Sequence, residues 1–251
     1  MISPARRLCS VFAFAVCSAF CQPVGAMSDA TSQLLSAVMA NSSHAAEAAL
    51  TAGADVNADT GEGRTPLIVA AMFTRPVMVK LLLDHGADPN KRADDPAIGN
   101  AVTAAFFAMN GVQLTGSADE PDAAKHAEAL EVLKLIAGRK VGLNMLVHRG
   151  QTELTALMIA AQAGAADAVA ALLSAGADPN ATNGGRYTAL DYAVDRAPAG
   201  SQASAADRAA IVRALLAAGA KVDRKPADGV SPRERAQRSG NAEIASLLKA
   251  A

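Results

Sequence analysis

The pentapeptide Gly-Ala-Asp-Pro-Asn occurs twice in this 251-residue chain, at 86–90 and at 176–180. Similar segments stand at 53–57 (Gly-Ala-Asp-Val-Asn) and at 219–223 (Gly-Ala-Lys-Val-Asp), and each copy follows an Ala- and Leu-rich run. A glycine after such a run favours the left-handed backbone conformation that ends a helix. A helix stop that recurs in this way predicts a stack of similar units.

The residue that closes each segment sets the repeat length. The shortest interval, from Asn57 to Asn90, is about 33 residues, a spacing typical of stacked helical repeats. The interval from Asn144 to Asn180 is slightly longer, and the one from Asn180 to Asp223 is longer still. The interval from Asn90 to Asn144 is the longest and holds one unit with a long insertion. The shortest interval is therefore the basic period, and the longer units add loops to it.

The clearest unit spans 58–90. Thr65 is a good capping residue for a first helix, and Pro66 stands in the first turn, where its missing N–H costs nothing. A second helix is expected to turn Leu82 inward and to end at Gly86.

This unit resembles an ankyrin repeat, whose pattern is Thr-Pro-Leu-x-x-Ala-Ala, a second helix with Leu-Leu, and then Gly-Ala-Asp-x-Asn. Weaker copies open at 100–105, 155–161 and 188–193, and the resemblance covers roughly 28–250. It implies an all-α solenoid of stacked helix pairs with β-hairpin or loop fingers, of about six repeats with an atypical cap at each end. The expected ankyrin domain is 27–251, with approximate repeats at 31–57, 58–90, 91–144, 145–180, 181–223 and 224–251.

The last repeat departs from the pattern because Arg233 stands where a full repeat has a buried Leu. A charge there suits a terminal cap that faces water on one side. Its neighbourhood is basic, which predicts a solvated cap or, as the alternative, a surface for an acidic partner. The basic residues are Arg224, Lys225, Arg233, Arg235 and Arg238.

The segment 1–26 is predicted to be a secretory signal peptide. Arg6 and Arg7 form a basic start, an apolar stretch runs from 8 to 20, and Val-Gly-Ala at 24–26 offers small residues for cleavage after Ala26. An uncleaved anchor is the alternative, although the apolar stretch is shorter than the ~20 residues that a spanning helix needs. A lipoprotein is disfavoured because bulky Phe20 precedes Cys21.

The composition limits how the domain can be stabilised. All three cysteines, Cys9, Cys17 and Cys21, lie in the predicted signal peptide, so the processed chain would form no disulfide. Aromatic residues make up 3% and Ala carries much of the apolar content, so the helices must pack closely over small side chains. The formal net charge of −1 gives no general attraction to nucleic acid or to anionic lipid.

No catalytic or metal-binding pattern stands out. The four histidines lie in different units without ligand spacing, no phosphate loop follows a strand pattern, and no nucleophile motif occurs. We therefore expect no enzyme, no cofactor and no metal. His85, at the end of a helix, is expected to bind the last carbonyls.

The resemblance implies that a partner protein contacts the finger tips and the exposed face of the first helices. At those positions stand Glu62, Arg64, Met72, Phe73, Phe107, Gln162, Tyr187, Asp195 and Arg196. Met72 and Phe73 are the informative pair, since bulky apolar side chains that face solvent mark interaction sites. The alternative is that both pack against a neighbouring unit. Phe73 and Tyr187 are the predicted main contacts.

Two insertions break the period, at about 110–122 and at about 197–205. Each is expected between the first and the second helix of its unit, on the edge opposite the fingers. They are either tolerated surface loops or a second contact surface.

The resemblance to exported bacterial ankyrin proteins implies a monomeric protein of the periplasm, without membrane insertion after signal cleavage. An extracellular location is the alternative. The protein would bind another protein as a scaffold or chaperone-like partner of an envelope enzyme. Two alternatives remain open: an immunity protein that neutralises a delivered toxin, and a secreted effector that acts on a host protein.

Overall fold

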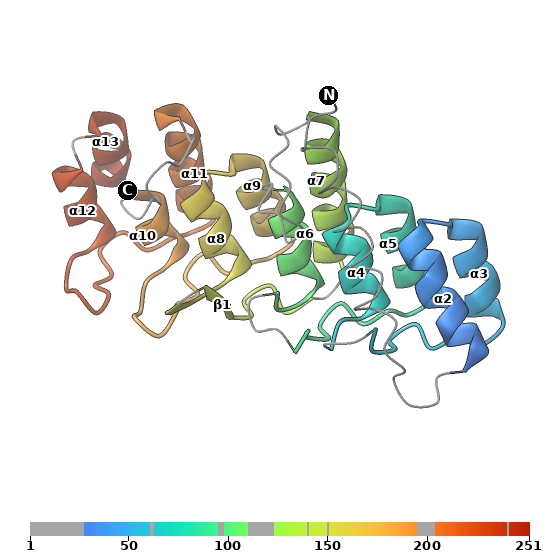
Figure 1. The fold of residues 1–251 in the computed structure, drawn as a ribbon. Helices are drawn as coiled ribbons and strands as arrows, with labels where there is room; N and C mark the ends of the chain where they lie inside the picture. Colours follow the sequence, from blue (N-terminus) through green and yellow to red (C-terminus); the bar gives the residue numbers. More distant parts are fainter. Residues whose placement is uncertain are drawn as a thin grey trace, which may run out of the picture.

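The computed structural model is a row of antiparallel helix pairs stacked side by side (Figure 1). It describes residues 28–60, 63–94, 98–109, 123–139, 141–149, 151–194, 204–239 and 241–251. The predicted signal peptide lies outside these residues. Six pairs are present in the described part of the chain, as expected for an all-α solenoid of about six repeats.

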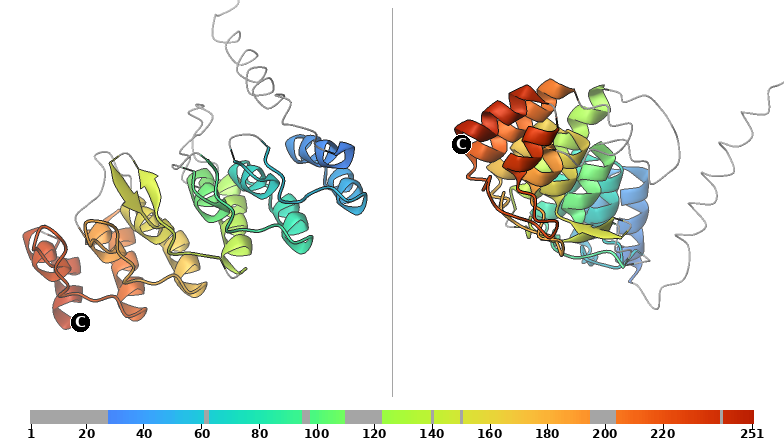
Figure 2. Two further views of the ribbon diagram at one scale, coloured as in Figure 1. Left: turned by 90° about the horizontal axis from the view of Figure 1, so that it is seen from below. Right: turned by 90° about the vertical axis from the view of Figure 1, so that its left-hand side faces the viewer.

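We call the pairs units one to six. They are α2 (Asp29–Ala40) with α3 (Ser43–Thr51), α4 (Pro66–Met72) with α5 (Pro76–Asp84), α6 (Ala101–Met109) with α7 (Ala123–Ala137), α8 (Ala156–Ala163) with α9 (Ala166–Ser174), α10 (Ala189–Val194) with α11 (Ala205–Ala217), and α12 (Pro232–Arg238) with α13 (Ala242–Ala250). The first helices form one layer and the second helices form the other, and the row curves gently (Figure 2).

The first helices begin where the sequence predicts. Thr65 accepts a hydrogen bond from the backbone N–H of Ile68 at 3.2 Å, and Thr155 accepts one from Met158 at the same distance. These bonds satisfy backbone donors that the first helical turn leaves free. Pro66 follows Thr65 in the first turn, as expected.

The second helices end at the recurring glycine. Gly86 has φ +85° and Gly176 has φ +95°, a conformation that other residues rarely adopt. After Gly86 the chain turns back, and the N–H of Ala87 donates to the carbonyl of Leu82 at 3.0 Å. His85 Nδ1 lies 2.9 Å from the carbonyl oxygen of Leu81, which is the helix-end contact predicted for it.

Fingers connect each unit to the next. Unit four is preceded by the only regular hairpin in the described residues, where β1 (Val147–Arg149) pairs antiparallel with β2 (Thr152–Leu154). The other described fingers are loops, which agrees with the expected mixture of hairpins and loops.

The asparagines that set the repeat length bind neighbouring units together from unit one to unit five. Asn57 Oδ1 accepts the backbone N–H of Asp88 at 2.7 Å, and Asn144 Oδ1 accepts that of Asp178 at 3.0 Å. Asn180 spans unit four to unit five, since it accepts from the N–H of Lys221 and donates to the carbonyl of Gly219, both at 2.9 Å. The repeated residue thus fixes the spacing of the stack.

One hydrophobic core runs the length of the stack. Leu34 of unit one, Leu82 of unit two, Leu172 of unit four and Leu248 of unit six are all fully buried in it. Buried alanines on the first helices let neighbouring helices approach closely. They include Ala70, Ala71, Ala104, Ala105, Ala160, Ala161 and Ala193.

The two insertions fall between the first and the second helix of their units. The first lies between α6 and α7 and the second between α10 and α11, as the sequence predicts. The second insertion ends one residue earlier than expected, because Ser204 caps α11 and Ala205 is its first residue. The rest of both loops lies outside the described residues.

Candidate partner-binding surface

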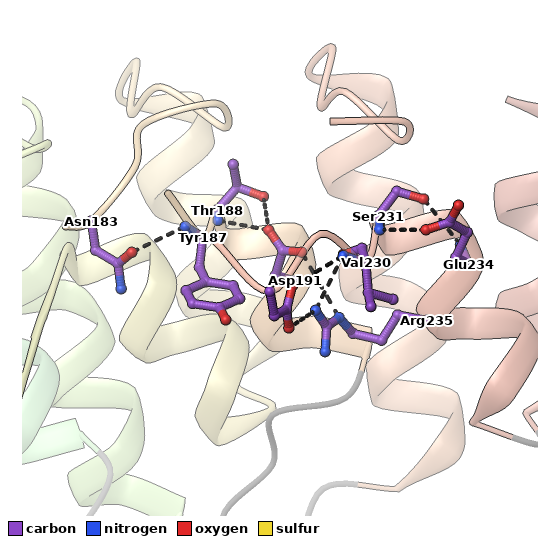
Figure 3. Close-up of polar contacts among 9 residues, drawn as sticks. Asn183, Tyr187, Thr188, Asp191, Val230, Ser231, Glu234 and Arg235 are labelled. Carbon is purple, nitrogen blue, oxygen red and sulfur yellow. Dashed lines mark hydrogen bonds and ion pairs between the residues drawn. The ribbon is translucent and has the colours of Figure 1, made fainter. Parts of the chain in front are cut away.

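The finger before unit five, residues 183–187, is held rigidly by Asn183. The Oδ1 atom of Asn183 accepts the backbone N–H group of Tyr187 at 3.0 Å (Figure 3). It also accepts the backbone N–H of Gly185 at 3.0 Å, and the Nδ2 atom of Asn183 donates to the hydroxyl of Tyr192 at 3.0 Å. The tip residue Arg186 is exposed and has φ +60°. The finger therefore presents its tip in one fixed conformation.

Tyr187 is partly buried beside this finger. Its ring packs edge-to-face on that of Tyr192, with centroids 6.3 Å apart, and the guanidinium of Arg235 lies 6.0 Å from its centroid. Such contacts hold an aromatic side chain in place without covering it completely. Tyr187 is thus a fixed side chain at the junction of units five and six.

Met72 and Phe73 end the first helix of unit two, and both are partly buried against the core. The Arg75 guanidinium lies 5.0 Å from the centre of the Phe73 ring and also donates to the carbonyl of Val38 in unit one. Val77 nearby is 67% exposed. The pair therefore packs against the core, which is the alternative foreseen for it, and keeps part of its surface accessible.

The turn after Phe73 is strained. Thr74 has φ +50°, at the place where units one and four have Asn41 and Gly164. Asparagine and glycine adopt this conformation readily, whereas it is an outlier for a β-branched residue. Backbone strain of this kind is found most often at functional sites.

The other predicted contacts are spread along the stack. Arg64 is partly buried just before α4, and Gln162 is partly exposed near the end of α8. Phe107 lies in α6, but its side chain is outside the described set, as are Glu62, Asp195 and Arg196. Phe73 and Tyr187 come from units two and five, so these residues form an extended surface and not one pocket. Whether a partner contacts them stays a prediction.

The basic C-terminal end was predicted to be solvated, and this is wrong for Arg235. Arg235 is only 8% exposed, and its Nη2 donates to Asp228 Oδ2 at 2.7 Å and to the carbonyl of Val230 at 3.2 Å (Figure 3). The residue four positions after the cap faces the preceding unit, so the side chain of Arg235 lies against unit five.

The remaining charges of this end are largely compensated within the chain. Arg233 forms two hydrogen bonds to Asp223, at 2.7 and 3.2 Å, and so is not the freely solvated charge that was expected. Lys225 Nζ lies 3.5 Å from Glu234 Oε1. An acidic partner therefore meets fewer available cations here than the sequence predicts.

Asp191 is a buried charged residue that no sequence motif indicates. It is 2% exposed, and its Oδ2 accepts bonds from the backbone N–H and the hydroxyl of Thr188, at 2.8 and 2.9 Å. Burial raises the pKa of Asp191, while the bonds from Thr188 and the charge of Arg235 act in the opposite direction. Its place in the repeat could have indicated burial, because units two and four have the apolar residues Ile68 and Met158 at the same position.

Within the described residues, no three His, Cys, Asp or Glu side chains come together as a metal site would require. None of the helices described there is both long and apolar enough to cross a bilayer.

Comparison with known proteins agrees with this architecture. A family model described as ankyrin repeats (3 copies) matches residues 14–93 and 122–225. A curated relative, the BTB/POZ domain and ankyrin repeat-containing protein NBCL of Lotus japonicus, is 56% identical over 43 residues. That match covers 17% of this chain and 9% of the relative.

Three solved structures have a similar fold. The ankyrin repeat protein EF0377 is 25% identical with a TM-score of 0.67, over 87% of this chain and 97% of that one. An ankyrin repeat domain from Acinetobacter baumannii is 23% identical with a TM-score of 0.67, over 86% and 96%. A chain from the complex of the predatory endopeptidase Bd0816 of Bdellovibrio bacteriovorus with immunity protein Bd3460 is 21% identical with a TM-score of 0.58, over 90% and 99%.

The family model covers well over half of the chain, and its repeats coincide with helix pairs joined by fingers. Ankyrin repeats indicate a protein–protein interaction module. The chain belongs to the ankyrin repeat family.

Proposed function

We propose that this protein is an exported, non-catalytic binding module of the periplasm, which acts as a scaffold or chaperone-like partner of an envelope enzyme. The observation that carries the proposal is the stack itself. The apolar side chains of six helix pairs form one continuous core, which leaves the fingers and the helix edges for recognition. The partner contacts the finger tips and the first-helix face.

Two anchor points support this binding mode. Phe73 and Tyr187 are partly exposed aromatic side chains, each held by an arginine and by neighbouring apolar groups. Aromatic side chains that lose little freedom on binding are frequent hot spots.

A pull-down from envelope extract tests the proposal. The full chain, with an affinity tag at its C-terminus, should capture one main partner. Alanine at both Phe73 and Tyr187 should weaken capture about tenfold or more, since a hot-spot residue contributes ~2 kcal/mol and each 1.4 kcal/mol is tenfold. Val77→Ala is the matched control, because Val77 is exposed but not a predicted contact. Equal capture by the double variant and the wild type would refute these contacts.

An immunity protein is the second candidate. The observation that favours it is the fold match over 90% of this chain to a chain from a complex whose other component is an endopeptidase. Adding the purified protein to its captured partner separates the candidates. An immunity protein abolishes the partner's activity, whereas a scaffold leaves that activity unchanged or raises it.

The proposed export rests on Arg6, Arg7 and the apolar stretch 8–20. Fractionation with mass measurement tests it, and we expect a periplasmic chain that begins at Met27. A processed chain found only in the medium or in a host cell would favour the secreted effector.

A further inference from the structure

The junction between units five and six differs from the other described junctions. The fourth residue after the capping residue is Val69 in unit two, Ile159 in unit four and Tyr192 in unit five, and all three are buried. In unit six this residue is Arg235. A guanidinium therefore takes the place of an apolar or aromatic side chain in the contact between neighbouring first helices.

Two carboxylates face this single guanidinium. Asp228 binds Arg235 directly at 2.7 Å, whereas Asp191 Oδ1 lies 4.0 Å from Arg235 Nε, too far for a hydrogen bond (Figure 3). Asp191 Oδ1 is buried and has no hydrogen-bond partner among the described residues. When Asp191 is ionised, the cluster has an excess negative charge. The carboxylate of Asp191 is then out of contact with water, whereas the side chain of Asp228 is 34% exposed.

The neighbouring elements do not compensate this charge in the described structure. Helix α8 has no ionisable side chain, and on α11 Arg208 binds the carbonyl of Ala193 at 3.3 Å. The other charged groups are exposed or paired elsewhere. They are Arg186 at the finger tip, Lys225 with Glu234, Arg233 with Asp223, Asp207 with Ser204, Arg213 with Glu243, and Arg238 at the end of α12.

We infer that unit six is an acid-strengthened cap, which docks on unit five more tightly when Asp191 is protonated than when it is ionised. With Asp191 neutral, one carboxylate of Asp228 and one guanidinium of Arg235 remain, and their charges balance. When α12 leaves, the carboxyl of Asp191 becomes accessible to water, where the ionised form is stable. Ionisation of Asp191 therefore favours the form in which unit six is undocked from unit five.

The direction of the titrations agrees with this inference. Burial raises the pKa of Asp191, so its contribution to docking is largest at low pH and is lost as the pH rises through the raised value. The hydrogen bond from Arg235 lowers the pKa of Asp228, so this pair persists until the pH falls below the ordinary range of an aspartate. The cap is expected to be tightest between these two titrations.

Unit six depends on such electrostatic contributions because it has few apolar contacts. The buried residues of α12 are Pro232, Arg235 and Ala236, and those of α13 are Ile244 and Leu248. A change in the charge of the junction therefore alters a small docking free energy.

Hydrogen exchange measured by mass spectrometry on the full chain tests the inference. The measured quantity is the ratio of two amide protection factors at the same pH, that of segment 232–250 divided by that of segment 156–174. The ratio cancels the effect of pH on the chemistry of exchange, which both segments share. Asp191→Asn mimics the protonated side chain. At about pH 7 it should raise this ratio tenfold for each unit by which docking raises the pKa of Asp191. In the wild type the ratio should rise as the pH falls, whereas in Asp191→Asn it should stay flat.

Asp223→Asn is the matched control, because it removes a carboxylate that is 71% exposed from the ion pair with Arg233 of unit six. It should leave the pH dependence of the ratio unchanged. Asp228→Asn should lower the ratio at a pH where Asp191 is protonated, since the buried guanidinium of Arg235 then has no carboxylate to balance it. A wild-type ratio that does not change with pH, or a lower ratio for Asp191→Asn, overturns the inference. Should Asp191→Asn not fold, the wild-type carboxyl is titrated by carbon NMR, and a midpoint at or below the ordinary 3.8 overturns it.

Discussion

Some single residues differ from their counterparts in the other repeats, and the local backbone geometry allows the effect on stability to be predicted. Thr74 is the clearest case, since its φ of +50° stands where unit four has a glycine. The side chain of a β-branched residue is crowded in this conformation, at a cost of roughly 1–2 kcal/mol. Thr74 stands between Phe73, which packs against the core, and Arg75, which donates to the carbonyl of Val38 in unit one.

Thr74→Gly should raise the free energy of unfolding by about 0.5–1 kcal/mol. Glycine removes the strain, but it also loses more conformational entropy on folding, which offsets part of the gain. Urea unfolding followed by circular dichroism measures the change. Thr74→Ala is the control, because alanine keeps the Cβ atom and should give little or no gain. A gain of equal size in both variants would argue against strain as the cause.

At the scale of the elements, each helix pair is stabilised by its neighbours. The side chain of Leu172 in α9 is fully buried in the common core. One pair cannot bury its apolar face alone, so a cavity in one unit weakens the contacts with both adjacent units.

Leu172→Ala should therefore lower the free energy of unfolding by ~2–5 kcal/mol and destabilise much of the array. Thermal melting gives the readout. Val77→Ala, at an exposed position, should change it little. A melting temperature of Leu172→Ala within a degree or so of the wild type would contradict the packing described above.

The fingers are coupled through their asparagines in a similar way. Asn180→Ala removes a donor and an acceptor that join unit four to unit five. We expect a loss of about 1–3 kcal/mol, since two backbone groups lose their partner. Hydrogen exchange should show faster opening at 219–223, while exchange at 53–57, near Asn57, should serve as the unchanged reference. Faster exchange at both places would indicate a general effect on stability.

For the whole molecule, stability depends on several carboxylates with lowered pKa values. Hydrogen bonds from Lys80 and Arg139 lower the pKa of Asp84, which joins the end of α5 to the turn after α7. The pKa values of Asp207, Asp228 and Glu234 are also lowered, by bonds from Ser204, Arg235 and Ser231 respectively. The stability that these groups contribute is present above their ordinary values of 3.8 for Asp and 4.5 for Glu. It is lost as the pH falls through the lowered values.

The urea midpoint of the whole chain should therefore fall as the pH is taken from about 5 to about 2.5. Asp84→Asn should reduce this dependence slightly, because its carboxylate is exposed and its ion pairs are weak. A midpoint that stays constant over this range would mean that the carboxylates titrate alike in the folded and unfolded chain.

Features that depend only on neighbouring residues were predictable from the amino-acid sequence. Thr65 caps a helix through the N–H three residues later, and Gly86 ends one through its own backbone freedom, so both can be read without knowing the fold. The repeat period and the family pattern then give the stack. The partner surface is foreseen only in outline, because the burial of Met72 and Phe73 depends on what lies beside them.

The contacts between units could not be predicted in this way, because they depend on how the helices stack. Asp191 and Arg235 are far apart in the sequence and meet because α10 and α12 are neighbours in the stack. In the sequence each is a single charged residue on a short helix, and the charge of Arg235 predicted a side chain exposed to solvent. The stack places both between two units, where water is excluded. The two repeat positions that hold Ile68 and Val69 in unit two therefore hold a buried carboxyl and a buried guanidinium at this junction.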